Sequence, residues 1–137
     1  MATDGPHLVA FKRDDPIVIG SAAPESMADV DAMKKFGDQV IGVVNKYPGL
    51  KLILTFERVE YLSSAALTEL IRINDVLAQQ NGQLTLGGLS AEMYKVFEVT
   101  KLDQLFGLSP GEDVGASVQR FKASVQGDFD PLRDSPK

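Results

Sequence analysis

The strongest constraint on the fold of this chain is an alternation of short apolar runs with helical periodicity from Ser26 onward. Residues 51–56 and 83–86 have the length and composition of β-strands, and the first run is nearly continuous in apolar residues, as expected of a strand covered on both faces. Each run is followed by a segment with helical spacing. This order predicts right-handed crossovers and a largely parallel sheet.

Helices are indicated wherever apolar residues recur at steps of three and four. The first helix is expected to be capped near Ser26, with Asp29 three residues later, and to end at Pro48-Gly49. The second is expected to run from Ser63-Ser64 to about Gln80. Its buried positions are Ala66, Leu70, Ile73 and Leu77, and its solvent-exposed positions include Thr68 and Arg72.

The remaining elements follow from shorter signals. Residues 8–11 and 17–19 predict two strands around a turn, and Ser90 predicts the cap of a third helix ending near Thr100. Residues 105–108 are expected to form a last short strand. Ser109-Pro110-Gly111-Glu112 is typical of a helix start and opens a final helix.

These elements predict one α/β domain at residues 8–121, with a mixed, mostly parallel sheet of about five strands and about four helices. Residues 1–7 are expected to be a flexible N-terminus. Residues 122–137, which are polar and contain two prolines, are expected to be a flexible C-terminal tail.

Composition excludes several classes of function. With 14 Lys+Arg against 19 Asp+Glu the net charge is −5, and no basic stripe is visible, so no nucleic acid partner is expected. Cysteine is absent, which rules out disulfides and thiolate chemistry. Neither a signal peptide nor an apolar run long enough to span a membrane is recognisable. The chain is therefore expected to be cytoplasmic, with no membrane partner.

No pattern of catalytic residues emerges. His7 is the only histidine and is far in sequence from the serines, and no G-x-S-x-G spacing surrounds Ser63 or Ser64. Gly87-Gly88 lacks the spacing and the lysine of a phosphate-binding loop. The carboxylates are scattered. We therefore predict that the chain is not an enzyme and holds no metal or cofactor.

The turn at Ser63-Ser64 is the best candidate for a functional surface. A serine before a helix stabilises it as an N-cap by about 1 kcal/mol, but one serine is enough for that task. A phosphate at this turn would lie near free helix N–H groups and would add about two negative charges to a surface that a partner buries. Both interpretations, structural cap and phosphorylation switch, follow from the residues.

Three segments resemble the STAS domain, the family of sulphate transporters and anti-sigma factor antagonists. They are residues 81–86, residues 88–106 and Tyr61-Leu62-Ser63-Ser64-Ala65-Ala66-Leu67. The resemblance implies a four-helix α/β fold with a mixed sheet. It also implies a bacterial regulator that binds an anti-sigma factor with a kinase-like ATPase fold. This binding releases the sigma factor. Phosphorylation of a serine in the regulator then ends the binding.

The family pattern places its acceptor at the first residue of Ser-Ser-Gly or Thr-Ser-Gly after an aspartate. It therefore implies Ser63 as the phosphoacceptor, with Ser64 as second choice and as the helix cap. Leu62 and Ala65 replace the aspartate and glycine of the pattern. The partner surface that the resemblance implies consists of Leu62, Ser63, Ser64, Ala65, Thr68, Glu69 and Arg72.

The partners expected are an anti-sigma factor or another serine kinase-like regulator. A phosphatase and a second copy of the chain are further partners that the resemblance allows. Two alternatives stay open: a STAS scaffold or self-assembling module that is never phosphorylated, and a module that binds a small ligand or nucleotide.

Overall fold

The computed structural model describes residues 8–60, 62–108 and 113–129. Four strands form one sheet in the order β1-β2-β3-β4, with β1 antiparallel to β2 and the other pairs parallel. The strands are β1 (Val9–Asp14), β2 (Ile17–Ala22), β3 (Lys51–Thr55) and β4 (Gln83–Gly87). A 3-10 helix, η1 (Pro24–Met27), precedes α1 (Val30–Lys46), α2 (Ser64–Gln79), α3 (Ala91–Val99), α4 (Leu102–Phe106) and α5 (Val114–Phe129). The α/β class and the mostly parallel sheet are confirmed.

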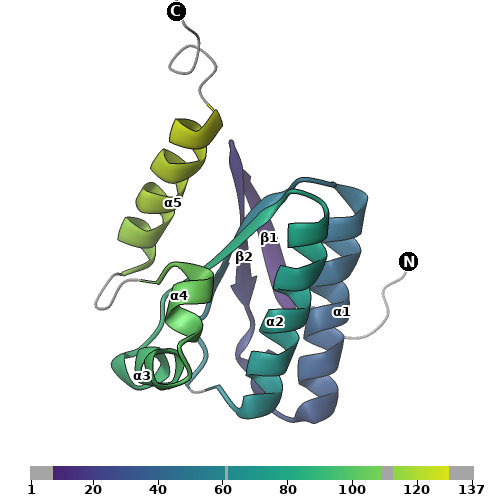
Figure 1. Cartoon of the computed structure of the whole chain (residues 1–137). Helices are drawn as coiled ribbons and strands as arrows, with labels where there is room; N and C mark the ends of the chain where they lie inside the picture. Colours follow the sequence, from purple (N-terminus) through teal and green to yellow (C-terminus); the bar gives the residue numbers. More distant parts are fainter. Residues whose placement is uncertain (1–7, 61, 109–112, 130–137) are drawn as a thin grey trace, which may run out of the picture.

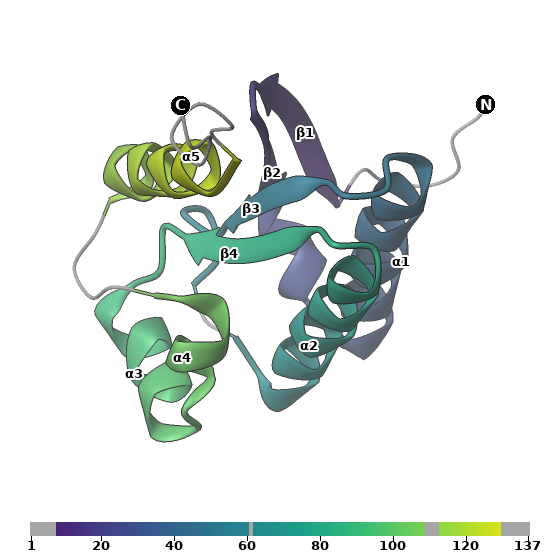
Figure 2. The same ribbon diagram turned by 45° about the horizontal axis from the view of Figure 1, so that its top comes forward.

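The helices lie on both faces of the sheet. Helices α1 and α2 cover one face and α5 covers the other, while α3 and α4 lie beside β4, the edge strand of the sheet (Figures 1 and 2). Leu52 and Leu54 of β3 belong to the core under α1 and α2, and Ile53 packs with Phe121 and Val125 of α5. The continuous apolar run of β3 is therefore explained by burial on both faces, as predicted.

Helix α1 is capped by Asp29, whose carboxylate accepts a hydrogen bond from the Ala32 N–H at 2.8 Å. The expectation of a cap at Ser26 was wrong. Ser26 is buried in η1 and its hydroxyl donates to the carbonyl oxygen of Ala23 at 2.7 Å. Both residue types cap helices, and the intervening 3-10 turn decides between them.

Helix α4 replaces the strand expected at residues 105–108, so the described part of the chain has four strands rather than about five. Lys101 takes a left-handed conformation (φ 66°) and starts a new helical segment after α3. The Phe106 ring packs edge-on against Phe97, with 6.0 Å between centroids. The Thr85 hydroxyl donates to the Phe106 carbonyl oxygen at 2.8 Å, which ties α4 to β4 by a side chain.

Helix α5 extends to Phe129, past the domain boundary expected at Phe121. Val118, Phe121 and Val125 continue the same apolar stripe and are buried against the sheet. The expected capping sequence at residues 109–112 lies outside the described residues. In the described part, the Asp113 carboxylate accepts a hydrogen bond from the Ala116 N–H at 2.8 Å.

No helix in the described ranges combines the length and the apolar character that crossing a membrane would need.

Candidate functional site

The loop between β3 and α2 is anchored to the core. The Phe56 N–H donates to the Gly87 carbonyl oxygen at 3.0 Å, and the Phe56 ring is fully buried 6.3 Å from the ring of Phe36. Val59 and Leu62, further along the loop, are also buried. These contacts hold the loop against the core both near β3 and near α2. Ser63 therefore directly follows a segment that is packed in place.

Ser63 is the N-cap of α2. Its backbone is extended (φ −89°, ψ 172°), and its hydroxyl oxygen accepts a hydrogen bond from the Ala66 N–H at 3.3 Å. The same hydroxyl donates to the sulfur of Met33 in α1 at 3.3 Å. Ser63 is half-buried, whereas Ser64 is the first helical residue and is exposed. The cap expected at Ser64 is therefore at Ser63.

The exposed part of the predicted partner surface centres on Ser64 and Thr68. The Thr68 hydroxyl donates to the Ser64 carbonyl oxygen at 3.1 Å, so the two residues share one face of α2. Leu62 belongs to the core with 6% exposure, and Ala65 packs partly against that core. The structure thus separates these two apolar residues from the exposed face.

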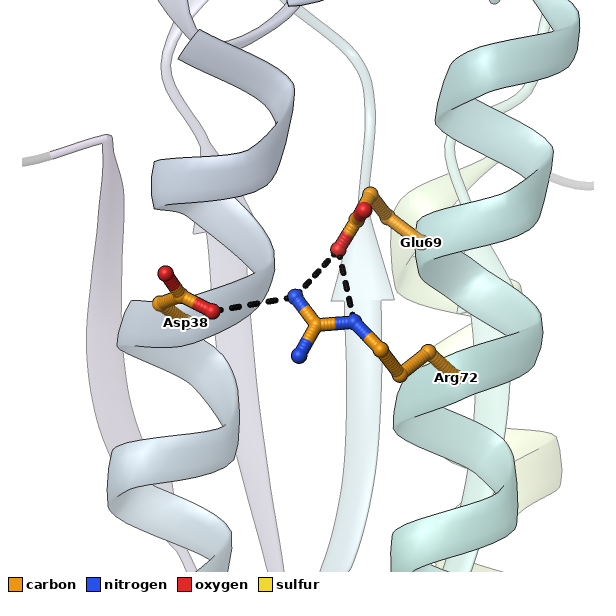
Figure 3. A network of polar contacts seen from close by, with 3 residues as sticks. All are labelled: Asp38, Glu69 and Arg72. Atoms are coloured by element: carbon orange, nitrogen blue, oxygen red, sulfur yellow. Dashed lines mark hydrogen bonds and ion pairs between the residues drawn. The ribbon is translucent and has the colours of Figure 1, made fainter. Parts of the chain in front are cut away.

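Glu69 and Arg72 join α2 to α1 (Figure 3). Arg72 donates from Nε to Glu69 Oε1 at 3.0 Å and from Nη2 to Asp38 Oδ1 at 3.0 Å. The hydrogen bond to Glu69 raises the pKa of the Arg72 guanidinium above its usual value. The Glu69 side chain is only 15% exposed. Both residues were expected on the exposed side of α2 as part of the partner surface, and they are engaged between two helices.

Sequence reasoning missed Gly37 and Asp38 as parts of this arrangement. A Cβ atom added at Gly37 would lie 2.2 Å from Glu69 Oε1 and 2.8 Å from Arg72 Nη2. Gly37 therefore makes room for the ion pair on the surface of α1. In the sequence, a glycine inside a helical pattern indicates only a weaker helix, because the residues of the facing helix are distant in the chain.

The first turn of α2 contains no acidic residue, whereas the first turns of α1 and α3 contain Asp31 and Glu92. The positive end of the α2 dipole is therefore not offset by an acidic side chain in the first turn of α2. An anionic group added at Ser63 or Ser64 would be stabilised there by the dipole and by the first-turn N–H groups.

A small pocket of about 280 Å³ lies between the β3–α2 loop, the start of α3 and the start of α5. Among the described residues, its ionisable lining groups are Glu57 and Asp113, so their charge is negative and does not suit a nucleotide phosphate. Gly88 in its wall has φ 69°. Across the described ranges, no group of three or more Asp, Glu or His side chains could hold a metal ion. His7 lies outside those ranges.

The chain belongs to the STAS domain family, whose profile it matches over residues 28–119. Solved structures with the same fold have low identity to it. An anti-sigma factor antagonist from Mycobacterium paratuberculosis has a TM-score of 0.68 and 18% identity, covering 83% of this chain and 92% of that one. The protein TM1081, solved by NMR, has a TM-score of 0.70 and 19% identity, covering 89% and 94%.

A third solved structure is an anti-sigma-factor antagonist (STAS) domain protein from Planctomyces limnophilus. It has a TM-score of 0.64 and 15% identity, covering 72% of this chain and 86% of that one. No curated protein sequence matches the chain significantly. These similarities establish the fold alone.

Proposed function

We propose that this chain is a bacterial, cytoplasmic regulator of transcription of the anti-sigma factor antagonist type, which acts by binding a kinase-like anti-sigma factor rather than by catalysis. Membership of the STAS family supports this proposal, as do two structural neighbours described as anti-sigma factor antagonists. In this role the bound chain keeps the anti-sigma factor away from its sigma factor.

The observation that carries the proposal is the arrangement of exposed and buried side chains in the turn at the start of α2. Ser64 and Thr68 are exposed on one helix face beside the half-buried Ser63. The loop that leads to them is packed against the core through Phe56 and Leu62. A polar surface on a loop that is packed against the core suits a partner that binds without changing the conformation of that loop.

Serine phosphorylation is the proposed switch. The family pattern favours Ser63 as acceptor, but the Ser63 hydroxyl must first leave Ala66 N and Met33 Sδ. Ser64 is exposed and is the more accessible acceptor. A phosphate on either residue adds about two negative charges that a docked partner would have to desolvate. Phosphorylation therefore weakens the complex while the dipole of α2 helps the domain stay folded.

The test combines phosphorylation with binding. The purified chain is incubated with ATP and each candidate anti-sigma factor of the source organism, and phosphate is located by mass spectrometry. Calorimetry then compares the wild type with Ser63→Asp, Ser64→Asp and Ser124→Asp. Aspartate also caps helices, so Ser63→Asp is expected to fold. The control residue, Ser124, is exposed on α5, on the opposite face of the sheet.

We expect Ser63→Asp or Ser64→Asp to weaken binding at least tenfold, about 1.4 kcal/mol, with no change for Ser124→Asp. If neither serine is phosphorylated and both aspartate variants bind like wild type, the switch is wrong. If no candidate anti-sigma factor binds, the proposed partner class is wrong as well.

A second candidate is a STAS scaffold that works without phosphorylation. The observation that favours it is the engagement of the Ser63 hydroxyl in two hydrogen bonds, together with the burial of Leu62 where the family pattern has an aspartate. Stable binding of a partner or self-association, measured by sedimentation, with no phosphate on either serine would favour the scaffold.

A further inference from the structure

A groove of about 630 Å³ lies between the β1–β2 turn, the C-terminal end of α1 and the connection from α1 to β3. These segments are at the end of the sheet opposite to the start of α2 (Figure 1). The volume is within the range of about 300–1,000 Å³ that is typical of small-molecule sites. None of the residues of the Ser63 turn lines it. The groove is therefore separate from the proposed partner surface.

The walls of the groove are apolar. Phe11 comes from β1, Val43 and Tyr47 come from the last turns of α1, and Leu50 precedes β3. Tyr47 is 57% exposed, unlike the three other residues, which are half-buried. An apolar occupant would remove this aromatic surface from water, which is favourable at about 25 cal/mol per Å².

The charge of the groove is opposite to that of the chain as a whole. Its ionisable lining groups besides Tyr47 are Arg13, Lys51 and Asp15, a net charge of +1 on a chain of net charge −5. Arg13 pairs with Asp15 at 2.8 Å. Within the described residues, the Lys51 ammonium donates to a neutral acceptor, the Asn81 carbonyl oxygen, at 3.2 Å. Among the groups that the structure describes, one cation of the groove therefore has no carboxylate paired with it.

We propose that this groove binds a small organic anion that consists of an apolar or aromatic body and one acidic group, with the body against Val43 and Tyr47 and the acid beside Lys51. The single excess positive charge matches a monoanion, and the apolar walls match its body. A nucleotide, with several charges and a polar sugar, does not match these walls.

The test uses a pair of fluorescent probes that differ in charge. The anionic probe is 1-anilinonaphthalene-8-sulfonate, and the neutral probe is N-phenyl-1-naphthylamine, which has the same aromatic body without the acid. Both are titrated into the folded full chain. We expect saturable binding of the anion at one site per chain, competition by decanoate, and chemical-shift changes at Tyr47 and Leu50 in NMR spectra.

Three variants locate the site. Val43→Asp places a negative charge on the apolar wall and is expected to weaken binding of the anionic probe more than tenfold. Lys51→Gln is expected to weaken the anionic probe several-fold and leave the neutral probe unchanged. Val99→Asp is the matched control, because Val99 is 73% exposed on α3 and does not line the groove.

Circular dichroism verifies that each variant is folded. If Val43→Asp does not fold, the proposal is tested by comparing the binding of the two probes to Lys51→Gln. The proposal is overturned by non-saturable binding, by binding that survives Val43→Asp in a folded protein, or by equal losses of both probes on Lys51→Gln. Loss of binding in Val99→Asp would also overturn it, because the site would then be on α3.

Discussion

At the scale of single residues, the two neighbouring serines have different surroundings. Ser63 is held by Ala66 N and Met33 Sδ, while the Ser64 side chain is exposed. The cap satisfies a helix N–H that would otherwise have no intrahelical partner. The exposed serine is available for contact without any cost to the fold.

Replacement of each serine by alanine tests this difference. Ser63→Ala is expected to lower the free energy of unfolding by about 1 kcal/mol, because a side-chain cap is lost. Ser64→Ala is expected to stay within about 0.5 kcal/mol of wild type, because the side chain is exposed. Urea unfolding followed by circular dichroism measures both. Equal destabilisation by the two variants would contradict the assignment of the cap.

The two glycines inside α1 give a second matched pair. Within the described residues, nothing outside the backbone of α1 lies within 4 Å of a Cβ added at Gly42, so Gly42→Ala is expected to stabilise the protein by about 0.5–1 kcal/mol through helix propensity. Gly37→Ala gains the same propensity but displaces Glu69 and Arg72 from α1. We expect its stability to fall at least about 1 kcal/mol below that of Gly42→Ala. Thermal unfolding compares them, and equal stabilisation would show that the ion pair moves aside freely.

At the scale of elements, α4 is held by contacts that are distant in sequence. Thr85 of β4 is buried and its hydroxyl donates to the last carbonyl of α4, which has no intrahelical donor. Phe106 adds the edge-on contact with Phe97. The short helix therefore depends on the sheet rather than on its own propensity.

Loss of this hydroxyl has a defined effect. Thr85→Val keeps the shape of the side chain but leaves a buried carbonyl without its donor, which is expected to cost about 1–3 kcal/mol. Thr100→Val removes a hydroxyl that also donates to helix carbonyls, but at an exposed position where water can replace it. We expect that change to stay within about 0.5 kcal/mol. Guanidinium unfolding separates them, and a neutral Thr85→Val would exclude the tether.

The elements show where sequence patterns suffice and where they do not. The stripe of Ala66, Leu70, Ile73 and Leu77 predicted α2, and all four residues are fully buried. The sequence of residues 105–108 predicts a strand although it lies partly in α4, because a short apolar run has no period that distinguishes a strand from a helix. Lys101 in the left-handed conformation carries no local signal, since glycine is the usual residue there.

The candidate site was predictable in the same uneven way. The turn at Ser63-Ser64 and its place before α2 follow from capping chemistry and the family resemblance. The engagement of Glu69 and Arg72 does not, because it depends on Asp38 and Gly37, which lie more than 30 residues earlier in a facing helix. The pattern within one helix indicates which of its faces is exposed to solvent. It does not indicate which of its charged side chains will contact a neighbouring helix.

At the scale of the whole molecule, α5 completes the second face of the sheet. Val118, Phe121 and Val125 cover Ile17 and Ile53, and Lys122 pairs with Asp14 of β1 at 3.0 Å. This layer is smaller than the one formed by α1 and α2. The stability of the domain therefore includes residues beyond the boundary expected at Phe121.

Shortening a buried side chain of α5 tests that contribution. Val125→Ala is expected to lower the free energy of unfolding by about 2 kcal/mol, because two buried carbon atoms are lost and a cavity remains. Ser124→Ala, at the adjacent exposed position, is expected to change it by less than about 0.5 kcal/mol. Differential scanning calorimetry provides the comparison. Equal melting temperatures for wild type and Val125→Ala would show that the end of α5 does not stabilise the domain.

The bridge from Arg72 to Asp38 has a consequence for the speed of association. Because it adds to the buried packing that holds α2 against α1, next to the face that carries Ser64 and Thr68, little conformational entropy would remain to be lost there if the proposed partner docks. Encounters then succeed without a slow rearrangement of the helix pair. Cutting the bridge with Arg72→Met is expected to lower the association rate constant of a partner more than it raises the dissociation rate constant.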